Sequence, residues 1–212
     1  TEAKNHSEAI AQRDGLVDCS GNLRAIAVTL FNVSNNIRWL GSGPRCGFYE
    51  IMLPDRQPGS SIMPGKVNPV MPELMNLVAF RVMGNDYTVT LAAHSGQLQL
   101  NAYEPLNGFA NMESQDLLMN VSKLFRTKCV DGITANKPGA KRSAEATLSA
   151  ATALNSAIGY DKAAEIALKA WREDLTLRQS ALALGYVTDA QFTEWVRPES
   201  MIAPGEAGAG GG

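Results

Sequence analysis

Apolar residues recur with helical spacing along most of this chain, in a few long segments and then several short ones. In residues 7–40, two sevenfold apolar series run offset by three residues: Leu16, Leu23, Leu30 and Ile37, and then Cys19, Ile26, Val33 and Leu40. Two such series form the seam along which a long helix packs lengthwise against others. The pattern therefore predicts one long helix over residues 7–40, with both series on its packed side.

Two further long helices are predicted downstream. One begins near Pro69 or Pro72, because proline is tolerated in a first helical turn, and it ends at a break at Ser95-Gly96. The other covers about residues 105–129. Their apolar positions are Leu74, Leu77, Val78, Val82, Val89 and Leu91 in the first, and Phe109, Met112, Leu117, Val121, Leu124 and Phe125 in the second. Three long helices with short connections indicate an all-α bundle.

The composition changes at residues 131–139, where we place a domain boundary. Beyond it, shorter alanine-rich helices are predicted over residues 140–158, 161–173, 176–184 and 188–196, and Thr188 and Gln191 have the spacing of a capping box. We expect residues 1–131 to be bundle, residues 132–202 to be a small C-terminal helical domain, and residues 203–212 to be a flexible Gly/Ala tail.

Composition and charge narrow the possible functions. The 212 residues are 45% hydrophobic, enough for a substantial core, and the net charge of −2 indicates neither a nucleic-acid nor a membrane partner. No apolar run approaches membrane-spanning length, and no secretory signal opens the sequence. Three cysteines without metal-ligand spacing indicate free thiols in the cytoplasm. With only two histidines we expect no multi-histidine metal site, and we expect no cofactor.

The chemistry-bearing stretch is residues 58–69, PGSSIMPGKVNP, whose glycines and prolines predict a loop between two long helices. Ser60 and Ser61 offer hydroxyl groups, Lys66 a positive charge and Asn68 a neutral donor, a set that suits an anionic small molecule. A serine can act as a base only with nearby positive charge, N–H donors and exclusion of water. The alternative is an ordinary connecting loop.

The order of residues in this loop favours the functional interpretation. Residues 59–69, GSSIMPGKVNP, match the signature of the fumarase/aspartase superfamily, G-S-S-x-M-P-x-K-x-N-P. The chain resembles this superfamily as far as about Met201, and residues 18–45 and 152–164 resemble class II fumarases in particular. The resemblance implies a helical bundle with a small C-terminal domain, and a lyase that reversibly eliminates water or an amine from a succinyl skeleton to give fumarate.

The resemblance also implies a role for each polar residue. Ser60 is then the base that abstracts the carbon proton, Lys66 and Asn68 hold the substrate carboxylate, and Ser61 makes a secondary contact. Glu73 has two interpretations. An acid in the first turn complements the helix dipole. By resemblance, it is instead the carboxylate partner of a catalytic histidine, whose basicity it raises.

The superfamily also relies on upstream motifs, a Thr/Ser cluster and a Thr-His pair that supplies the catalytic histidine, and neither occurs in this sequence. His94 is not at a recognised family position. We therefore expect the chain to correspond to the C-terminal part of a family member. Because family sites combine segments from different subunits of a tetramer, we also expect a homo-oligomer.

Three functions stay open at this point. Both ends of the chain favour fumarate hydratase, which converts malate to fumarate and water. The middle, residues 68–73, 84–90 and 96–101, is more similar to aspartate ammonia-lyase, and Leu98-Gln99 stands where class II fumarases usually carry Phe-Glu. The third possibility is an inactive fragment or helical assembly module that lacks the histidine segment. We favour fumarate hydratase, with a small dicarboxylate as substrate, because that resemblance covers more residues.

Overall fold

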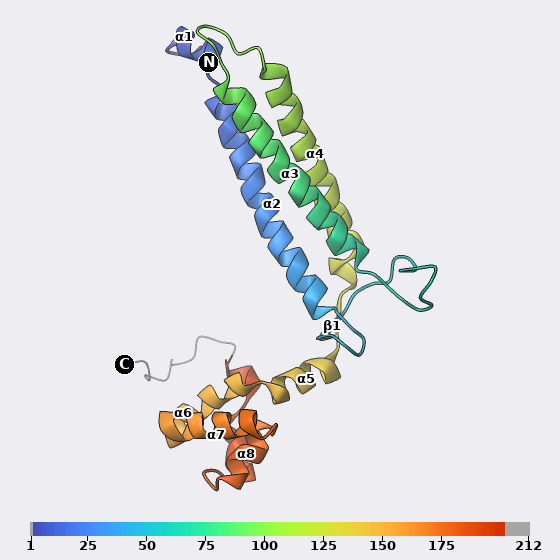
Figure 1. The fold of residues 1–212 in the computed structure, drawn as a ribbon, viewed down its shortest axis with the longest axis vertical. Coiled ribbons are helices and arrows are strands. Elements are labelled where there is room, and N and C mark those ends of the chain that lie inside the picture. Colours follow the sequence, from blue (N-terminus) through green and yellow to red (C-terminus); the bar gives the residue numbers. More distant parts are fainter. Residues whose placement is uncertain (1, 202–212) are drawn as a thin grey trace. The chain divides into compact units, whose positions relative to one another are not determined.

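The computed structural model describes residues 2–201, and the predicted tail, residues 203–212, lies outside the described residues. The fold is all-α, as predicted, and the strands found among the described residues are two residues long each (Figure 1). Contacts between Cα atoms divide the chain into two compact units, Thr1–Ala135 and Asn136–Gly212. The assignment of residues 1–131 and 132–202 as family domains stays a prediction.

The first unit is built on three long helices that lie side by side, α2 (Asp14–Leu40), α3 (Val70–His94) and α4 (Glu104–Lys128) (Figure 1). Each starts and ends within a few residues of the predicted bounds, apart from the start of the first. The shorter elements are α1 (His6–Ala11), the 3-10 helix η1 (Val130–Gly132), and β1 (Ile51–Met52), which pairs antiparallel with β2 (Thr134–Ala135). The predicted three-helix arrangement is confirmed.

The prediction of one unbroken helix over residues 7–40 is wrong at its start, because the backbone leaves the helix at Gln12 and Arg13. The Arg13 guanidinium stabilises this break. Its Nη1 donates to the carbonyl oxygens of Ala9 at 3.0 Å and Gln12 at 2.7 Å, and its Nη2 pairs with Glu104 Oε2 at 2.7 Å. The spacing of apolar residues cannot reveal such a break, because the interactions that stabilise it are made by polar groups.

The packed side of α2 also differs from the predicted one. The buried positions are Ser20, Ala27 and Ser34. They lie four residues after Leu16, Leu23 and Leu30 of the first sevenfold series, called the leucine series below. The leucine series itself is partly buried as predicted, but Ile26 and Val33 of the second series are 50% and 45% exposed. Small side chains occupy the contact because α2 and α3 approach closely there. The prediction that both sevenfold series are packed is therefore wrong within this chain.

Several large residues on the other long helices are exposed as well. Val78, Val82, Val89, Val121 and Phe125 are buried as predicted. The predicted apolar positions that are exposed instead are Leu77, Leu91, Phe109, Met112 and Leu124. Each of α3 and α4 therefore has apolar side chains both in the core of the unit and on its surface.

Polar side chains fix the register of the three helices. Asp86, only 6% exposed, accepts hydrogen bonds from Ser20 Oγ and Arg24 Nη1, both at 2.8 Å. On the other side of α3, Asn85 Nδ2 donates to Glu113 Oε2 at 2.7 Å, and this bond, with help from Arg81, lowers the pKa of the Glu113 carboxyl. Buried polar groups that find such partners hold helices in a single alignment.

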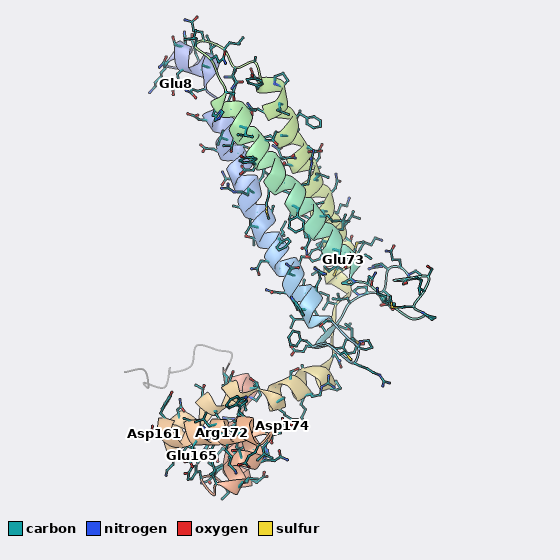
Figure 2. All side chains as sticks on the ribbon, viewed as in Figure 1. Glu8, Glu73, Asp161, Glu165, Arg172 and Asp174 are labelled. Carbon is teal, nitrogen blue, oxygen red and sulfur yellow. The ribbon has the colours of Figure 1, made fainter. Side chains whose placement is uncertain are left out.

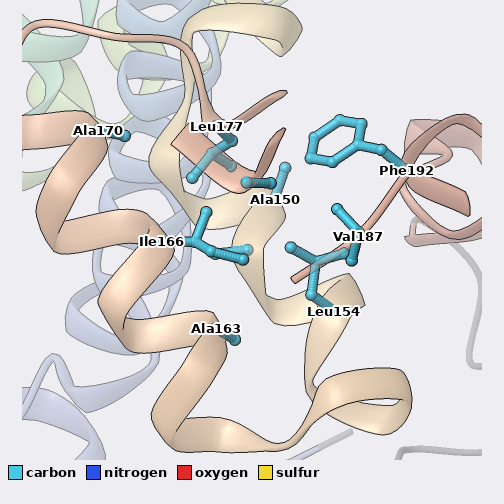
Figure 3. Close-up of a cluster of buried hydrophobic side chains, with 10 residues drawn as sticks. Ala150, Leu154, Ala163, Ile166, Ala170, Leu177, Val187 and Phe192 are labelled. Atoms are coloured by element: carbon cyan, nitrogen blue, oxygen red, sulfur yellow. The ribbon is translucent and has the colours of Figure 1, made fainter. Parts of the chain in front are cut away.

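The second unit consists of short helices: α5 (Lys137–Ala146), the 3-10 helix η2 (Leu148–Leu154), α6 (Asn155–Ile158), α7 (Tyr160–Arg172), α8 (Leu177–Ala183), α9 (Asp189–Trp195) and the 3-10 helix η3 (Pro198–Met201). They surround a small core in which Leu154, Ile166, Leu177, Val187 and Phe192 meet several alanines (Figure 3). None of the helices described in either unit is both long and apolar enough to cross a membrane.

Local capping explains where these short helices begin. The predicted capping box of Thr188 and Gln191 is confirmed, and Thr176 with Gln179 forms a second one at the start of α8. The single helix predicted over residues 140–158 is wrong. Thr147 is extended there, and its Oγ1 accepts a hydrogen bond from the Ser149 N–H, which starts a new helical segment.

We expect Asn107→Leu to stabilise the protein. Asn107 is fully buried in α4, and its Oδ1 and Nδ2 have no hydrogen-bond partner among the described residues. A buried polar group without partners costs about 1–3 kcal/mol, so the free energy of unfolding should rise by roughly 1 kcal/mol. Urea unfolding followed by circular dichroism measures the change.

Asn101 provides the matched control. It is 2% exposed, but its Nδ2 donates to the carbonyls of Ala92 and Ala93, and its Oδ1 accepts from the Tyr103 N–H. Asn101→Leu should therefore lower the free energy of unfolding. An equal loss in both variants would contradict the interpretation of Asn107.

Candidate active site

The segment predicted to be a loop, residues 58–69, joins β1 to α3 and is closed by its own hydrogen bonds. The Gly59 N–H donates to the Lys66 carbonyl oxygen at 2.6 Å, and Asn68 Nδ2 donates to the Gly59 carbonyl oxygen at 3.1 Å. Pro58 and Val67 form an antiparallel bridge beside these bonds. Figure 1 shows the closed loop projecting from the start of α3.

Two glycines make this closure possible. A Cβ atom added at Gly59 would lie 2.7 Å from the Lys66 carbonyl oxygen, closer than real Cβ atoms approach. Gly65 has φ +77°, in the left-handed region that favours glycine. The signature glycine, Gly59, and the additional Gly65 are therefore explained by the shape of the backbone at these two positions.

The loop presents its serines differently. Ser60 is half-buried, and its Oγ accepts a hydrogen bond from the Ile62 N–H at 3.1 Å, whereas Ser61 is exposed. A backbone N–H directed at a hydroxyl oxygen favours the deprotonated hydroxyl. Ser60 therefore has one of the features that a serine base requires.

Lys66 and Asn68 lie together at the wall of a hollow of about 590 Å³ in the first unit. Arg38 and Trp39, at the end of α2, line it too, as does much of the connector between residues 41 and 55. In the described chain, its lining does not include Ser60, Ser61 or Glu73. The structure thus brings together the two predicted carboxylate-binding residues, while the serines lie elsewhere on the loop. Two cations and an amide that line one hollow can hold an anionic molecule.

Glu73 lies in the first turn of α3, at the end of the helix nearest the loop (Figure 2). Its Oε1 is 3.8 Å from Arg38 Nη2, an ion-pair distance, and both side chains are about two-fifths exposed. Arg38 Nη1 also donates to Asn35 Oδ1 at 3.2 Å, and Asn76 Nδ2 donates to the same oxygen at 2.9 Å. Glu73 therefore has a charged partner that links it to α2.

Arg38, Asn35 and Asn76 were missed by reasoning from the sequence. The heptad pattern marks the apolar face of α2 and gives no role to its polar positions. The one available signal was that Asn35 and Arg38 lie within residues 18–45, the segment that resembles class II fumarases. Among the described residues, no group of three or more His, Cys, Asp or Glu side chains is placed to hold a metal ion.

Two family models match the chain. A lyase family model matches residues 1–84, and a model of the fumarase C C-terminus matches residues 151–203. The fumarate hydratase class II 1 of Pseudomonas aeruginosa is 50% identical over 209 residues, which cover 97% of this chain and 44% of that protein. The mitochondrial fumarate hydratase of Saccharomyces cerevisiae is 46% identical over 202 residues, 95% of this chain and 41% of that protein.

Solved structures show the same similarity. A class II fumarase from Schistosoma mansoni matches with a TM-score of 0.90 and 37% identity, over 96% of this chain and 43% of that one. A fumarate lyase:delta crystallin from Brucella melitensis, bound to cobalt, matches with a TM-score of 0.88 and 46% identity, over 96% of this chain and 44% of that one. The chain therefore spans less than half the length of these relatives.

Substitution of Gly59 tests the closure of the loop. In Gly59→Ala, the new Cβ would meet the Lys66 carbonyl oxygen, a backbone atom that cannot move alone, so the hydrogen bond between the two residues should break. Hydrogen exchange measured by mass spectrometry should then be faster in peptides that cover residues 58–69.

Gly15→Ala is the control, because a Cβ added there in α2 meets nothing within 4 Å. Alanine should stabilise that helix by up to about 1 kcal/mol and leave exchange in the loop unchanged. If Gly59→Ala also left exchange in the loop unchanged, the closure described above would be wrong.

Proposed function

The chain belongs to the fumarase/aspartase superfamily, and from this we propose that the protein containing it is a lyase that reversibly forms fumarate, acting as a fumarate hydratase on malate. The observation that carries the proposal is the superfamily signature, closed into a loop that places Lys66 and Asn68 at one hollow. The relatives named fumarate hydratases support water, rather than ammonia, as the leaving group.

The reaction requires removal of a very weakly acidic proton from the carbon beside a carboxylate. In our proposal, Ser60 takes this proton, and the C–H electron pair passes into the carboxylate, which becomes a doubly negative aci-carboxylate. Lys66 and Asn68 hold that carboxylate, so that positive charge and N–H donors face the place where negative charge develops. The electron pair then returns from the aci-carboxylate to form the carbon–carbon double bond as the C–O bond breaks, and the departing hydroxide takes up a proton to leave as water, which gives fumarate. Movement of the whole loop over the bound substrate would exclude water and strengthen these interactions.

Three further roles complete the site. We propose that Ser61 makes a secondary contact with the substrate and that Asn68 orients the carboxylate bound by Lys66. Asn68 Nδ2 carries two hydrogens, so its bond to the Gly59 carbonyl leaves one for a ligand. Glu73 acts as the carboxylate partner of the catalytic histidine of the superfamily. We propose no metal or cofactor, and a cytoplasmic location.

The aspartate ammonia-lyase alternative draws on residues 68–73, which adjoin the loop, and on residues 84–90 and 96–101, which lie farther along the chain. Leu98, which is 97% exposed, belongs to the turn between α3 and α4. The signature loop meets the other end of α3, about 37 Å away at 1.5 Å per residue. The aspartase-like turn is therefore remote from the hollow of the same chain, whereas Asn68 and Pro69 of residues 68–73 line it.

We also propose that the protein is a homo-oligomer, a tetramer as in the family. Large apolar side chains are exposed on all three long helices. Examples are Ile26 at 50% on α2, Leu77 at 65% and Tyr87 at 67% on α3, and Met112 at 61% and Met119 at 64% on α4. Soluble monomers rarely expose contiguous apolar surface beyond a few hundred Å². Contact with further copies would cover these faces.

Ser60→Ala tests the proposed base. In the native protein that contains this sequence, the variant should form fumarate from malate about a thousandfold more slowly, because it lacks the proton acceptor. Substrate binding should persist, since Lys66 and Asn68 remain. The ultraviolet absorbance of fumarate measures turnover, and Ser61→Ala is the matched control with a smaller effect.

The same assay separates the three functions. Fumarate formed from malate supports the hydratase, and fumarate formed from aspartate supports the ammonia-lyase. Neither product would favour the inactive module. Full turnover in Ser60→Ala would exclude Ser60 as the base.

Leu77→Glu tests the oligomer. A carboxylate on the exposed apolar face of α3 should weaken association, so sedimentation velocity should show a lower mass than for the unsubstituted protein. Leu168→Glu, the same change at a residue that is 48% exposed on α7 in the second unit, should have less effect. A single monomeric species before substitution would refute the homo-oligomer.

A further inference from the structure

A network of four polar side chains joins the end of α2 to the first turns of α3, beside the hollow. Asn35 and Arg38 lie three residues apart on α2, and Glu73 and Asn76 lie three residues apart on α3. Residues at that spacing share a helix face. The network therefore consists of two facing pairs at the contact between α2 and α3.

The Asn35 side chain anchors this network. Its Oδ1 accepts hydrogen bonds from Asn76 Nδ2 at 2.9 Å and from Arg38 Nη1 at 3.2 Å. Asn76 is only 6% exposed, so one donor to this oxygen is fixed inside the unit. One edge of the Arg38 guanidinium is thereby held against α2.

The geometry of a guanidinium then directs its remaining edge. The group is planar and rigid, so a bond from Nη1 also fixes the direction of Nη2. Arg38 Nη2 lies 3.8 Å from Glu73 Oε1, and among the described residues the Glu73 carboxylate has no other ion pair and no side-chain hydrogen bond. Arg38 is therefore the one described side chain that orients this carboxylate by charge.

We propose that Arg38 is a positioning residue for the reaction: held by Asn35, it orients Glu73, which in turn orients the catalytic histidine. This inference rests on the proposed function, because Glu73 acts on a histidine only in that reaction. A carboxylate that holds a histidine must present one oxygen in a fixed direction. Arg38 engages Oε1 and leaves Oε2 for that partner. Because misplacement of a catalytic group by about 1 Å can cost a hundredfold in rate, orientation of this kind affects turnover.

A second role for Arg38 makes a different prediction. Arg38 lines the hollow together with Lys66 and Asn68, so its cation could instead bind the substrate directly. Loss of a direct contact that is present in the bound substrate raises KM, whereas loss of a positioning residue lowers kcat. The split between kcat and KM therefore decides between the two roles.

The experiment compares variants of the native protein that contains this sequence. Arg38→Gln should lower kcat for malate about tenfold to a hundredfold while KM changes less than about threefold. Arg38→Lys should recover part of kcat, because lysine restores the positive charge but not the two fixed N–H edges of the guanidinium. Asn35→Ala should lower kcat less than Arg38→Gln, because the guanidinium is kept but loses its anchor.

Arg81→Gln is the control. Arg81 also forms an ion pair across two long helices, with Glu113 at 2.9 Å, and its side chain is 58% exposed, but it lies between α3 and α4 and does not line the hollow among the described residues. Its kcat and KM should match those of the unsubstituted protein. A rise in KM with unchanged kcat in Arg38→Gln would overturn the positioning role in favour of direct substrate binding.

A measurement that needs no turnover separates failure of this inference from failure of the proposed function. The ¹³C resonance of the Glu73 carboxyl, assigned with Glu73→Gln, should move in Arg38→Gln and stay in place in Arg81→Gln. If the resonance moves but the unsubstituted protein forms no fumarate, the proposed function fails and Arg38 has no catalytic role. If fumarate forms but Arg38→Gln changes neither the resonance nor kcat, the positioning role is wrong.

Discussion

The close contact between α2 and α3 is the constraint on which the rest of the first unit depends. Small residues at its centre, Ser20, Ala27 and Ser34, let the two helices approach, and hydrogen bonds fix their alignment. Ser20 bonds to Asp86, and Ser34 Oγ bonds to the Pro72 carbonyl at 2.8 Å. This alignment sets the end of α2 beside the start of α3, where Arg38 meets Glu73 and where the connector with the signature loop must return.

Apolar side chains of the long helices are divided between the core of the unit and its surface. The α2 side of the contact is built from serine and alanine, and α3 contributes larger buried residues such as Met75 and Val82. Other isoleucine, valine, leucine and methionine side chains lie exposed on the long helices. Burial of Asp86 and Ser20 costs little, because they are hydrogen-bonded to one another and Asp86 also pairs with Arg24. The unit thus combines a partly polar core with apolar outer faces that suit further helices.

The shape of the signature loop, residues 58–69, is set mainly by hydrogen bonds within the loop. Gly59, Lys66 and Asn68 close it with one backbone bond and one side-chain bond, so the residues that would bind a substrate are also those that hold the loop together. This double use explains why the signature includes glycine and asparagine beside the serine and lysine that carry the chemistry. The signature could be recognised in the sequence, whereas the hollow beside Lys66 and the pairing of Arg38 with Glu73 could not.

The sequence by itself determined the all-α class, the approximate extent of three long helices, one capping box and the loop, because spacing, caps, glycine and proline act over a few residues. Tertiary structure alone decided the break at Gln12 and Arg13, the division of residues 140–158, the sevenfold series that faces the core, and the Arg38 network. The physical reason is that periodicity shows which residues share a helix face but not which neighbour that face meets. That choice depends on how closely two helices approach and on polar contacts between residues distant in the chain.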